Sequence, residues 1–266
     1  MSVGSYNSVN LTQKQIEFVK LLDYHEIDIF TIETIEKQLE TKVKDLNEIL
    51  ENLVQKKLLA RIEKGKFCSY NFKDELVISN YLVKDGVIAY WTALNKHGLT
   101  EQFPNIIFVQ TAKDKREKKV FGVSYKFVRV AKNRLVGFDI YGYGNHQFRM
   151  SDVEKTIVDC FNLPEYSGGY AELIRAFNKA ELDSKKMVKY CKAIGNNAVT
   201  KRIAYLTEVL QKPNFDAFLK YAKTIVSGKY NLIDPFGNDK GEFVNEWKLR
   251  LNISKEDILE ICNKMY

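Results

Sequence analysis

Three stretches near the start of the chain carry hydrophobic residues at helical spacing. They cover residues 11–24, 30–40 and 43–57. In the third stretch, Leu46 and Leu50 lie one helical turn apart on the same face. Only about three residues separate the second and third stretches, which is the length of connection expected between packed neighbours. The pattern therefore predicts three amphipathic helices.

Two strand-like pieces follow these helices. Residues 58–63 and 68–72 are rich in strand-forming side chains and flank Lys64, Gly65 and Lys66, which form a tight-turn signal. Three helices followed by a β-hairpin are the outline of a winged helix-turn-helix. We expect this domain to occupy residues 1–75.

The middle of the chain contains an aromatic helical pattern that ends in a histidine. Tyr90, Ala93, Leu94 and His97 fall on one helical face, and Gly98 is placed to end the helix. A histidine in the last turn interacts favourably with the helix dipole. We therefore interpret His97 as a structural residue at a helix end, with a catalytic imidazole as the alternative.

The rest of the chain predicts a second domain of mixed structure. Alternating or continuous apolar runs indicate strands near residues 106–111, 120–130, 135–150 and 247–251. Helical spacing dominates from residue 152 to 226. The expected fold is α+β, with an N-terminal winged helix-turn-helix followed, in residues 76–266, by a small β-sheet and a C-terminal helical bundle.

Two capping patterns mark helix starts in this second domain. Ser151 is predicted to be an N-cap, because Glu154 follows three residues later. Ser254 and Asp257 have the same relation before a terminal helix.

The charge of the chain is unevenly distributed. The formal net charge is +7, from 41 Lys and Arg against 34 Asp and Glu. Residues 1–75 hold 11 of these basic residues and 13 of the acidic ones, so the remaining residues hold 30 and 21. A basic surface that binds a partner is therefore expected mainly in the second domain.

Composition narrows the protein class further. No apolar run approaches the roughly 20 residues that cross a bilayer, and no signal peptide pattern opens the chain. The four cysteines are scattered without a C-x-x-C pair, which is typical of reduced thiols in a cytosol. We expect a cytoplasmic protein with no metal, no cofactor and no membrane partner.

Two groups of residues in the second domain are of types found in catalytic or phosphate-binding sites. Asp152, Glu154, Lys155 and Asp159 bring carboxylates and an ammonium group together, although first-turn acids and an i,i+4 ion pair explain them equally well. The pair 168–169, Gly-Gly, precedes a helix and can bind a phosphate, or simply supply positive φ angles.

The first domain offers candidates for contact with DNA. A recognition helix presents Lys, Arg, Asn or Gln from its N-terminal half. The solvent face of the third helix also carries acidic residues at Asp45, Glu48 and Glu51. The candidate DNA-binding residues are Lys42, Lys44 and Asn47 on the third helix and Lys64 and Lys66 on the wing.

Three basic clusters lie in the second domain. Each is either a solvated face or a surface for phosphates or an acidic protein. Their members are Lys113, Lys115, Arg116, Lys118 and Lys119; Lys185, Lys186, Lys189 and Lys192; and Lys201 with Arg202.

The order of these parts resembles the AbiEi-type antitoxins, which belong to abortive-infection toxin–antitoxin pairs often labelled type IV. The resemblance covers roughly residues 12–252. Its more specific pieces are the S-D-x-E-K-T-I-x-D segment at 151–159 with the trailing glycine pair, and R-x-x-Y-L at 202–206.

The resemblance implies a non-enzymatic antitoxin that is also a DNA-binding transcriptional regulator. The winged helix would bind inverted repeats in double-stranded DNA at its own promoter and repress the operon. The second domain would counter a cognate nucleotidyltransferase-like toxin, and its basic clusters would assist DNA binding. Because residues 1–75 are slightly acidic, we expect the second domain to supply much of the affinity for DNA.

Two other classes of protein remain open at this stage. One is an enzyme that transfers a phosphoryl or nucleotidyl group to the toxin, through the region of Asp152, Lys155 and Asp159 and the glycine pair. The other is a winged helix that docks on protein and does not bind DNA.

Overall fold

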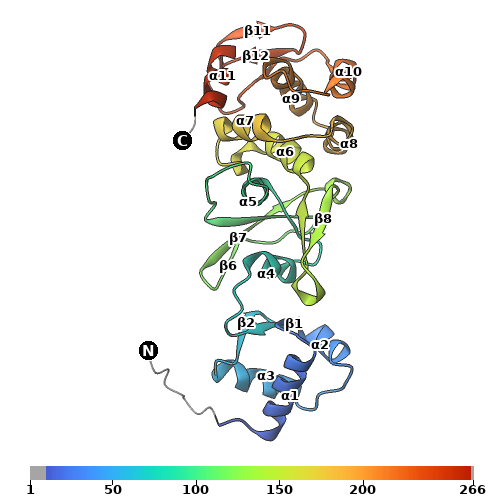
Figure 1. Cartoon of the computed structure of the whole chain (residues 1–266), viewed down its shortest axis with the longest axis vertical. Coiled ribbons are helices and arrows are strands. Elements are labelled where there is room, and N and C mark those ends of the chain that lie inside the picture. The colour runs from blue at the N-terminus through green and yellow to red at the C-terminus, as the bar shows by residue number, and fades with distance from the viewer. Residues whose placement is uncertain (1–9, 265–266) are drawn as a thin grey trace. The chain divides into compact units, whose positions relative to one another are not determined.

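The chain folds into two compact units with an α+β architecture (Figure 1). The computed structural model describes residues 10–264. Unit 1 comprises residues up to Lys84 together with Gly142–Gln147, and unit 2 comprises Asp85–Tyr141 and the chain from Phe148 onward. The chain therefore passes from one unit to the other three times. The predicted domain boundary at residue 75 falls at the first residue of a helix that belongs to unit 1.

The described residues of unit 1 form four α-helices and one three-stranded antiparallel sheet with strand order β1-β3-β2. Its elements are α1 (Gln13–Tyr24), β1 (Ile29–Thr31), α2 (Ile32–Gln38), α3 (Leu46–Gln55), β2 (Leu59–Glu63), β3 (Lys66–Ser69) and α4 (Glu75–Leu82). A capping box between Thr12 and Gln15 starts α1. Phe18, Phe30 and Phe67 pack at the centre of its core.

The third helix begins later than its hydrophobic pattern predicts. It starts at Leu46 and not at residue 43, because Asp45 adopts a left-handed backbone with φ 60°. The connection from α2 is held by a hydrogen bond from the Val43 amide to Glu36 Oε1, at 3.0 Å. The link between α2 and α3 therefore spans residues 39–45, longer than predicted.

The segment 142–147 is part of unit 1 although its flanking strands belong to unit 2. The Asn145 side-chain amide donates to the Ile29 carbonyl at 3.2 Å. Tyr81 Oη donates to the Ile29 carbonyl at 3.1 Å and to the Asn145 carbonyl at 3.2 Å. The Asp28 carboxylate lies 3.1 Å from His146 Nε2. These contacts fix the segment beside β1.

Unit 2 begins with a six-stranded mixed sheet in the order β6-β7-β5-β4-β9-β8. The strands are β4 (Val87–Ile88), β5 (Ile106–Thr111), β6 (Lys118–Val120), β7 (Val123–Arg129), β8 (Phe138–Tyr141) and β9 (Phe148–Ser151), and α5 (Tyr90–Lys96) lies between β4 and β5. Phe108 packs edge-on against Tyr90 of α5, so this face of the sheet joins the main core. The strand near 247–251 was predicted in this sheet, but it belongs to a separate one.

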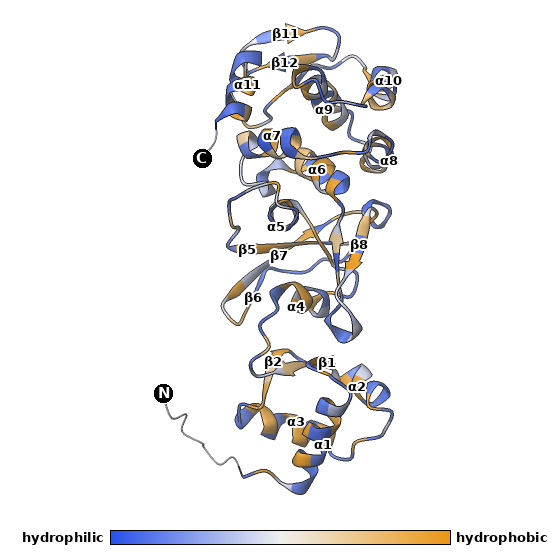
Figure 2. Ribbon diagram, viewed as in Figure 1, coloured by the Kyte–Doolittle hydropathy of each residue, from blue (hydrophilic) through white to orange (hydrophobic). Residues whose placement is uncertain are grey.

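Helices dominate the remainder of unit 2. They are α6 (Val153–Asn162), α7 (Tyr170–Lys179), α8 (Ser184–Ile194), α9 (Asn197–Val209), α10 (Asp216–Ile225) and α11 (Lys255–Asn263). A three-stranded sheet is formed by β10 (Asn231–Leu232), β12 (Leu249–Leu251) and β11 (Glu242–Val244), in that order. Hydrophobic residues recur along these helices and along β5 and β7 (Figure 2). In residues 10–264, no helix is long and apolar enough to cross a membrane.

Three helix ends test the capping predictions. His97 is the C-cap of α5, its Nε2 lies 2.7 Å from the Ser151 carbonyl oxygen, and Gly98 has positive φ as predicted. Ser254 and Asp257 form the predicted capping box of α11. Ser151 is not the N-cap of α6, because it is the last residue of β9 and Asp152 caps the helix instead.

Candidate nucleic-acid interface

Lys42 and Lys44 lie in the connection before α3 and not on the helix, which corrects their predicted placement. Both side chains are exposed. Lys42 approaches Glu36 at 3.4 Å, but its side chain is 94% exposed, so this pair is weak. Within residues 10–264, Lys44 forms no ion pair, and its ammonium group is available to a phosphate.

The N-terminus of α3 is open to an anion. Asp45 makes no side-chain cap there, because its carboxylate forms an ion pair with Lys14 at 2.6 Å. The hydrogen bond and the charge of Asp45 raise the pKa of Lys14, and the hydrogen bond from Lys14 lowers the pKa of Asp45. Asn47 is exposed in the first turn of the helix. Uncapped amides at a helix N-terminus favour phosphate oxygens.

A pocket of about 360 Å³ lies beside this helix end. It is formed by α1 and the connection before α3, and Lys14, Lys42 and Lys44 line it together with Glu17. Three ammonium groups around one hollow attract a phosphate, although Lys14 is already paired with Asp45.

The exposed face of α3 also carries two acidic side chains, Glu48 and Glu51, together with the neutral Gln55. Glu48 is exposed and forms no ion pair among the described residues, although its charge helps to raise the pKa of Lys14. Glu51 forms an ion pair with Arg61 of β2, which removes that arginine from the set of free cations. A duplex that approaches this face is therefore repelled by Glu48 and attracted only by the lysines at the helix start.

The two lysines of the β2–β3 turn differ. Lys64 is exposed at the tip of the turn, within reach of a phosphate. Lys66 is partly buried, forms an ion pair with Glu63 at 2.7 Å and donates to the Leu82 carbonyl at 3.3 Å. Lys66 therefore stabilises unit 1 and contributes little to an exposed basic surface.

The first basic cluster of unit 2 leads into β6. Lys113, Arg116 and Lys119 are exposed. Lys115 is half-buried, with its ammonium group 5.3 Å from the centre of the Phe127 ring, and Lys118 is half-buried within β6. Three of these five side chains thus present their charge to solvent.

The second cluster lies on α8. Lys185, Lys189 and Lys192 are exposed there. Lys186 lies 3.3 Å from both Asp152 and Glu154, so its charge is largely neutralised within the unit.

Lys201 and Arg202 are buried on α9, which corrects their assignment to a basic surface. Lys201 Nζ donates to the carbonyls of Lys229 and Lys248 at 2.8 and 3.2 Å, and Arg202 Nε donates to the Leu232 carbonyl at 2.9 Å. Burial lowers the pKa of both side chains. They hold the segments around β10 and β12 through backbone oxygens, and a local charge pattern cannot reveal that role.

The carboxylates considered for catalysis have partners within unit 2. Asp152 accepts hydrogen bonds from the Lys155 amide at 2.8 Å and from Tyr190 Oη at 2.6 Å. Lys155 and Asp159 form the predicted i,i+4 pair at 2.5 Å, but the pair is buried and not on the surface. These contacts tie the three side chains into the fold of unit 2.

The glycine pair before α7 has a packing role. Gly168 has φ 81°, and a Cβ atom there would lie 2.7 Å from the Trp91 indole. Gly169 has φ 112° at the N-cap of α7. Both observations favour the structural interpretation of this pair.

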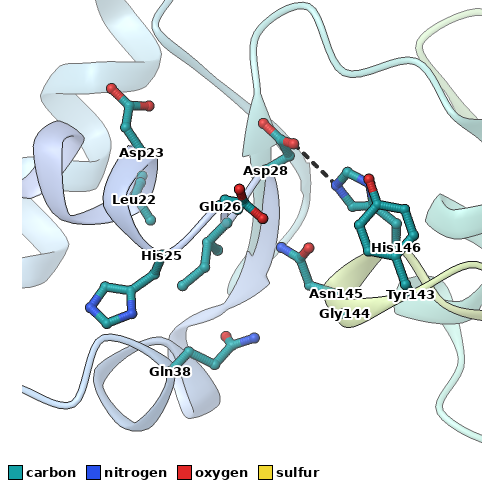
Figure 3. Close-up of a pocket in the computed structure, with 11 residues that line it drawn as sticks. Leu22, Asp23, His25, Glu26, Asp28, Gln38, Tyr143, Gly144, Asn145 and His146 are labelled. Carbon is teal, nitrogen blue, oxygen red and sulfur yellow. Dashed lines mark ion pairs between the residues drawn. The ribbon is translucent and has the colours of Figure 1, made fainter.

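Unit 1 also contains a cavity with a volume of about 630 Å³, which no pattern in the sequence predicts (Figure 3). It combines the end of α1, the turn 25–28, Gln38 and the segment 143–146. More than 100 residues separate the two main parts of its lining, so no local pattern could have brought them together.

Comparison with known proteins bears on the fold alone. No protein-family model matches the chain, and no curated protein matches it. The chain is similar to the crystal structure of the RV2827C protein from Mycobacterium tuberculosis, with a TM-score of 0.66 and 14% sequence identity. The similarity covers 96% of each chain.

Proposed function

We propose that the protein is a DNA-binding autorepressor and the non-enzymatic antitoxin of a cytoplasmic toxin–antitoxin pair. Unit 1 would act as a winged helix, with α3 in the major groove and the β2–β3 turn beside the phosphate backbone. The observation that carries DNA binding is the uncapped N-terminus of α3 next to exposed Lys42 and Lys44.

The charge of the two units suggests how they share the duplex. Unit 1 holds 12 Lys and Arg against 13 Asp and Glu, whereas unit 2 holds 29 against 21. Unit 1 would position the protein on inverted repeats at its own promoter, and the exposed lysines of unit 2 would supply much of the phosphate contact.

Binding to the upstream region of its own operon is expected to depend strongly on salt. With about six phosphate contacts, affinity should fall by about 10³ between 50 and 200 mM salt, because each contact releases counterions. A gel mobility-shift titration at several salt concentrations measures this, with a scrambled duplex of equal length as control. Absent binding, or binding that does not change with salt, would contradict the proposal.

The antitoxin role rests on the resemblance of the 151–159 and 202–206 segments to AbiEi-type antitoxins. The toxin would be a nucleotidyltransferase-like protein encoded beside this gene. Co-expression of that neighbour with this protein should restore the growth that the neighbour alone suppresses. The full chain is used in this test, and a neighbour that is harmless, or remains toxic at equal expression, would count against this role.

A further inference from the structure

The cavity in unit 1 takes no part in the proposed contacts with DNA. It lies at the C-terminal end of α1, whereas Lys14, which borders the candidate DNA surface, lies at the N-terminal end of the same helix. A helix of 12 residues is about 18 Å long, so the two features occupy opposite ends of α1. The cavity is therefore free for another ligand.

The lining of the cavity suits a cation. Asp23 and Glu26 are exposed at its edge, and neither has a cationic partner in the part of the chain that the structure describes. Asp28 is in contact with His146 at one side of the cavity (Figure 3). The lining thus offers two unpaired carboxylates in a hollow large enough for several side chains.

An exposed aromatic ring adds to this preference. Tyr143 lines the cavity and is 74% exposed. Guanidinium and ammonium groups bind to aromatic faces and to carboxylates, and arginine does both at once. The chemistry of the site therefore fits arginine and lysine side chains of a protein segment.

The same chain carries a segment with that chemistry. Residues 113–119 hold five basic and two acidic side chains, and most of the segment has no regular secondary structure. Arg116 and Lys119 are exposed and form no ion pair in residues 10–264. A slightly acidic unit 1 and a basic unit 2 make two copies of the chain complementary in charge.

We propose that this cavity receives the segment 113–119 of a second copy, so that two chains form a dimer with two equivalent contacts. Each chain contributes one cavity and one basic segment, as a two-fold axis requires. Such a dimer has the symmetry of an inverted repeat, but the contact itself needs no DNA. The dimer proposal can therefore fail while DNA binding holds, and DNA binding can fail while the dimer proposal holds.

Charge reversal on each side of the contact tests the proposal in the full chain. The first variant carries Asp23→Lys and Glu26→Lys, and the second carries Arg116→Glu and Lys119→Glu. Sedimentation velocity without DNA should show dimers of the wild type at low salt that dissociate at high salt. Each variant alone should raise the dimer dissociation constant at least about tenfold, because attraction becomes repulsion.

Recombining the two changes gives the decisive result. An equimolar mixture of the variants should form a heterodimer, since one contact then joins a reversed cavity to a reversed segment and the other joins an unchanged cavity to an unchanged segment. One chain that carries all four changes should dimerise again. Lys185→Glu with Lys189→Glu is the control, with the same charge change at exposed sites of α8. A wild type that stays monomeric at low salt, unchanged association of either variant, or no recovery in the mixture would overturn the proposal.

Discussion

Replacing Lys155 with methionine should lower the free energy of unfolding by about 3–5 kcal/mol, the largest effect on stability that we expect from a single side chain. Lys155 is 0% exposed and Asp159 is 2% exposed, and their charged atoms lie 2.5 Å apart. Removing the lysine leaves a carboxylate buried without its cation. Urea unfolding at neutral pH, followed by circular dichroism, measures the loss.

The sign of the pH effect follows from the surroundings of Asp159. Burial raises the pKa of this carboxyl, and Lys155 opposes that shift. Without Lys155 the folded-state pKa should rise further above the unfolded value. A carboxyl with a raised folded pKa favours the folded state at low pH and loses that contribution as pH rises through this pKa. The Lys155→Met variant should therefore be less destabilised near pH 5 than near pH 8.

Two further variants separate burial from charge. Lys155→Met combined with Asp159→Leu should recover most of the lost stability, because no uncompensated charge remains. Lys223→Met removes the exposed partner of Glu246, which lies 3.0 Å away, and should cost less than about 1 kcal/mol. Equal losses for Lys155→Met and Lys223→Met would contradict this account of the buried pair.

Changing Lys42, Lys44 and Lys64 to alanine should reduce affinity for operator DNA on the order of 100-fold at low salt. Each lysine is exposed, and each is proposed to face a phosphate. The loss should be similar for specific and scrambled duplexes, since phosphates carry no sequence. The slope of log affinity against log salt should decrease by about 0.9 for each contact removed.

Two comparisons make this result specific to the proposed surface. Alanine at exposed Lys20, Lys37 and Lys73 of unit 1 changes net charge equally and should leave affinity within about threefold. Glu48→Gln should raise affinity, because it removes an unpaired acid from the face of α3. If both lysine triples behave alike, only overall charge matters and α3 is not the contact.

Local signals in the sequence predicted many of the helices correctly. The helices of the second domain and the capping box of α11 follow from apolar spacing and short-range hydrogen bonds. The predicted start of α3 is too early, because Asp45 has a left-handed backbone and forms an ion pair with Lys14, which is distant in the sequence. Strands of two residues, such as β4, carry too little pattern to be recognised.

Predictions that depend on tertiary neighbours were weaker. The charge run at Lys201 and Arg202 looked like a surface, but α9 is buried on nearly all sides. Lys66 and Lys186 looked like free cations, and each is paired with a carboxylate. Basic side chains therefore identify a surface only after the packing around them is known.

The placement of residues 142–147 in unit 1 constrains how the protein is made. Until this segment has been synthesised, Tyr81 and Ile29 lack their contacts with Asn145, and Asp28 lacks its contact with His146. A nascent chain on the ribosome can form the helices of unit 1 early, but it cannot finish that unit before most of the six-stranded sheet has also emerged. Translation thus delays completion of the N-terminal unit until more than half of the polypeptide exists.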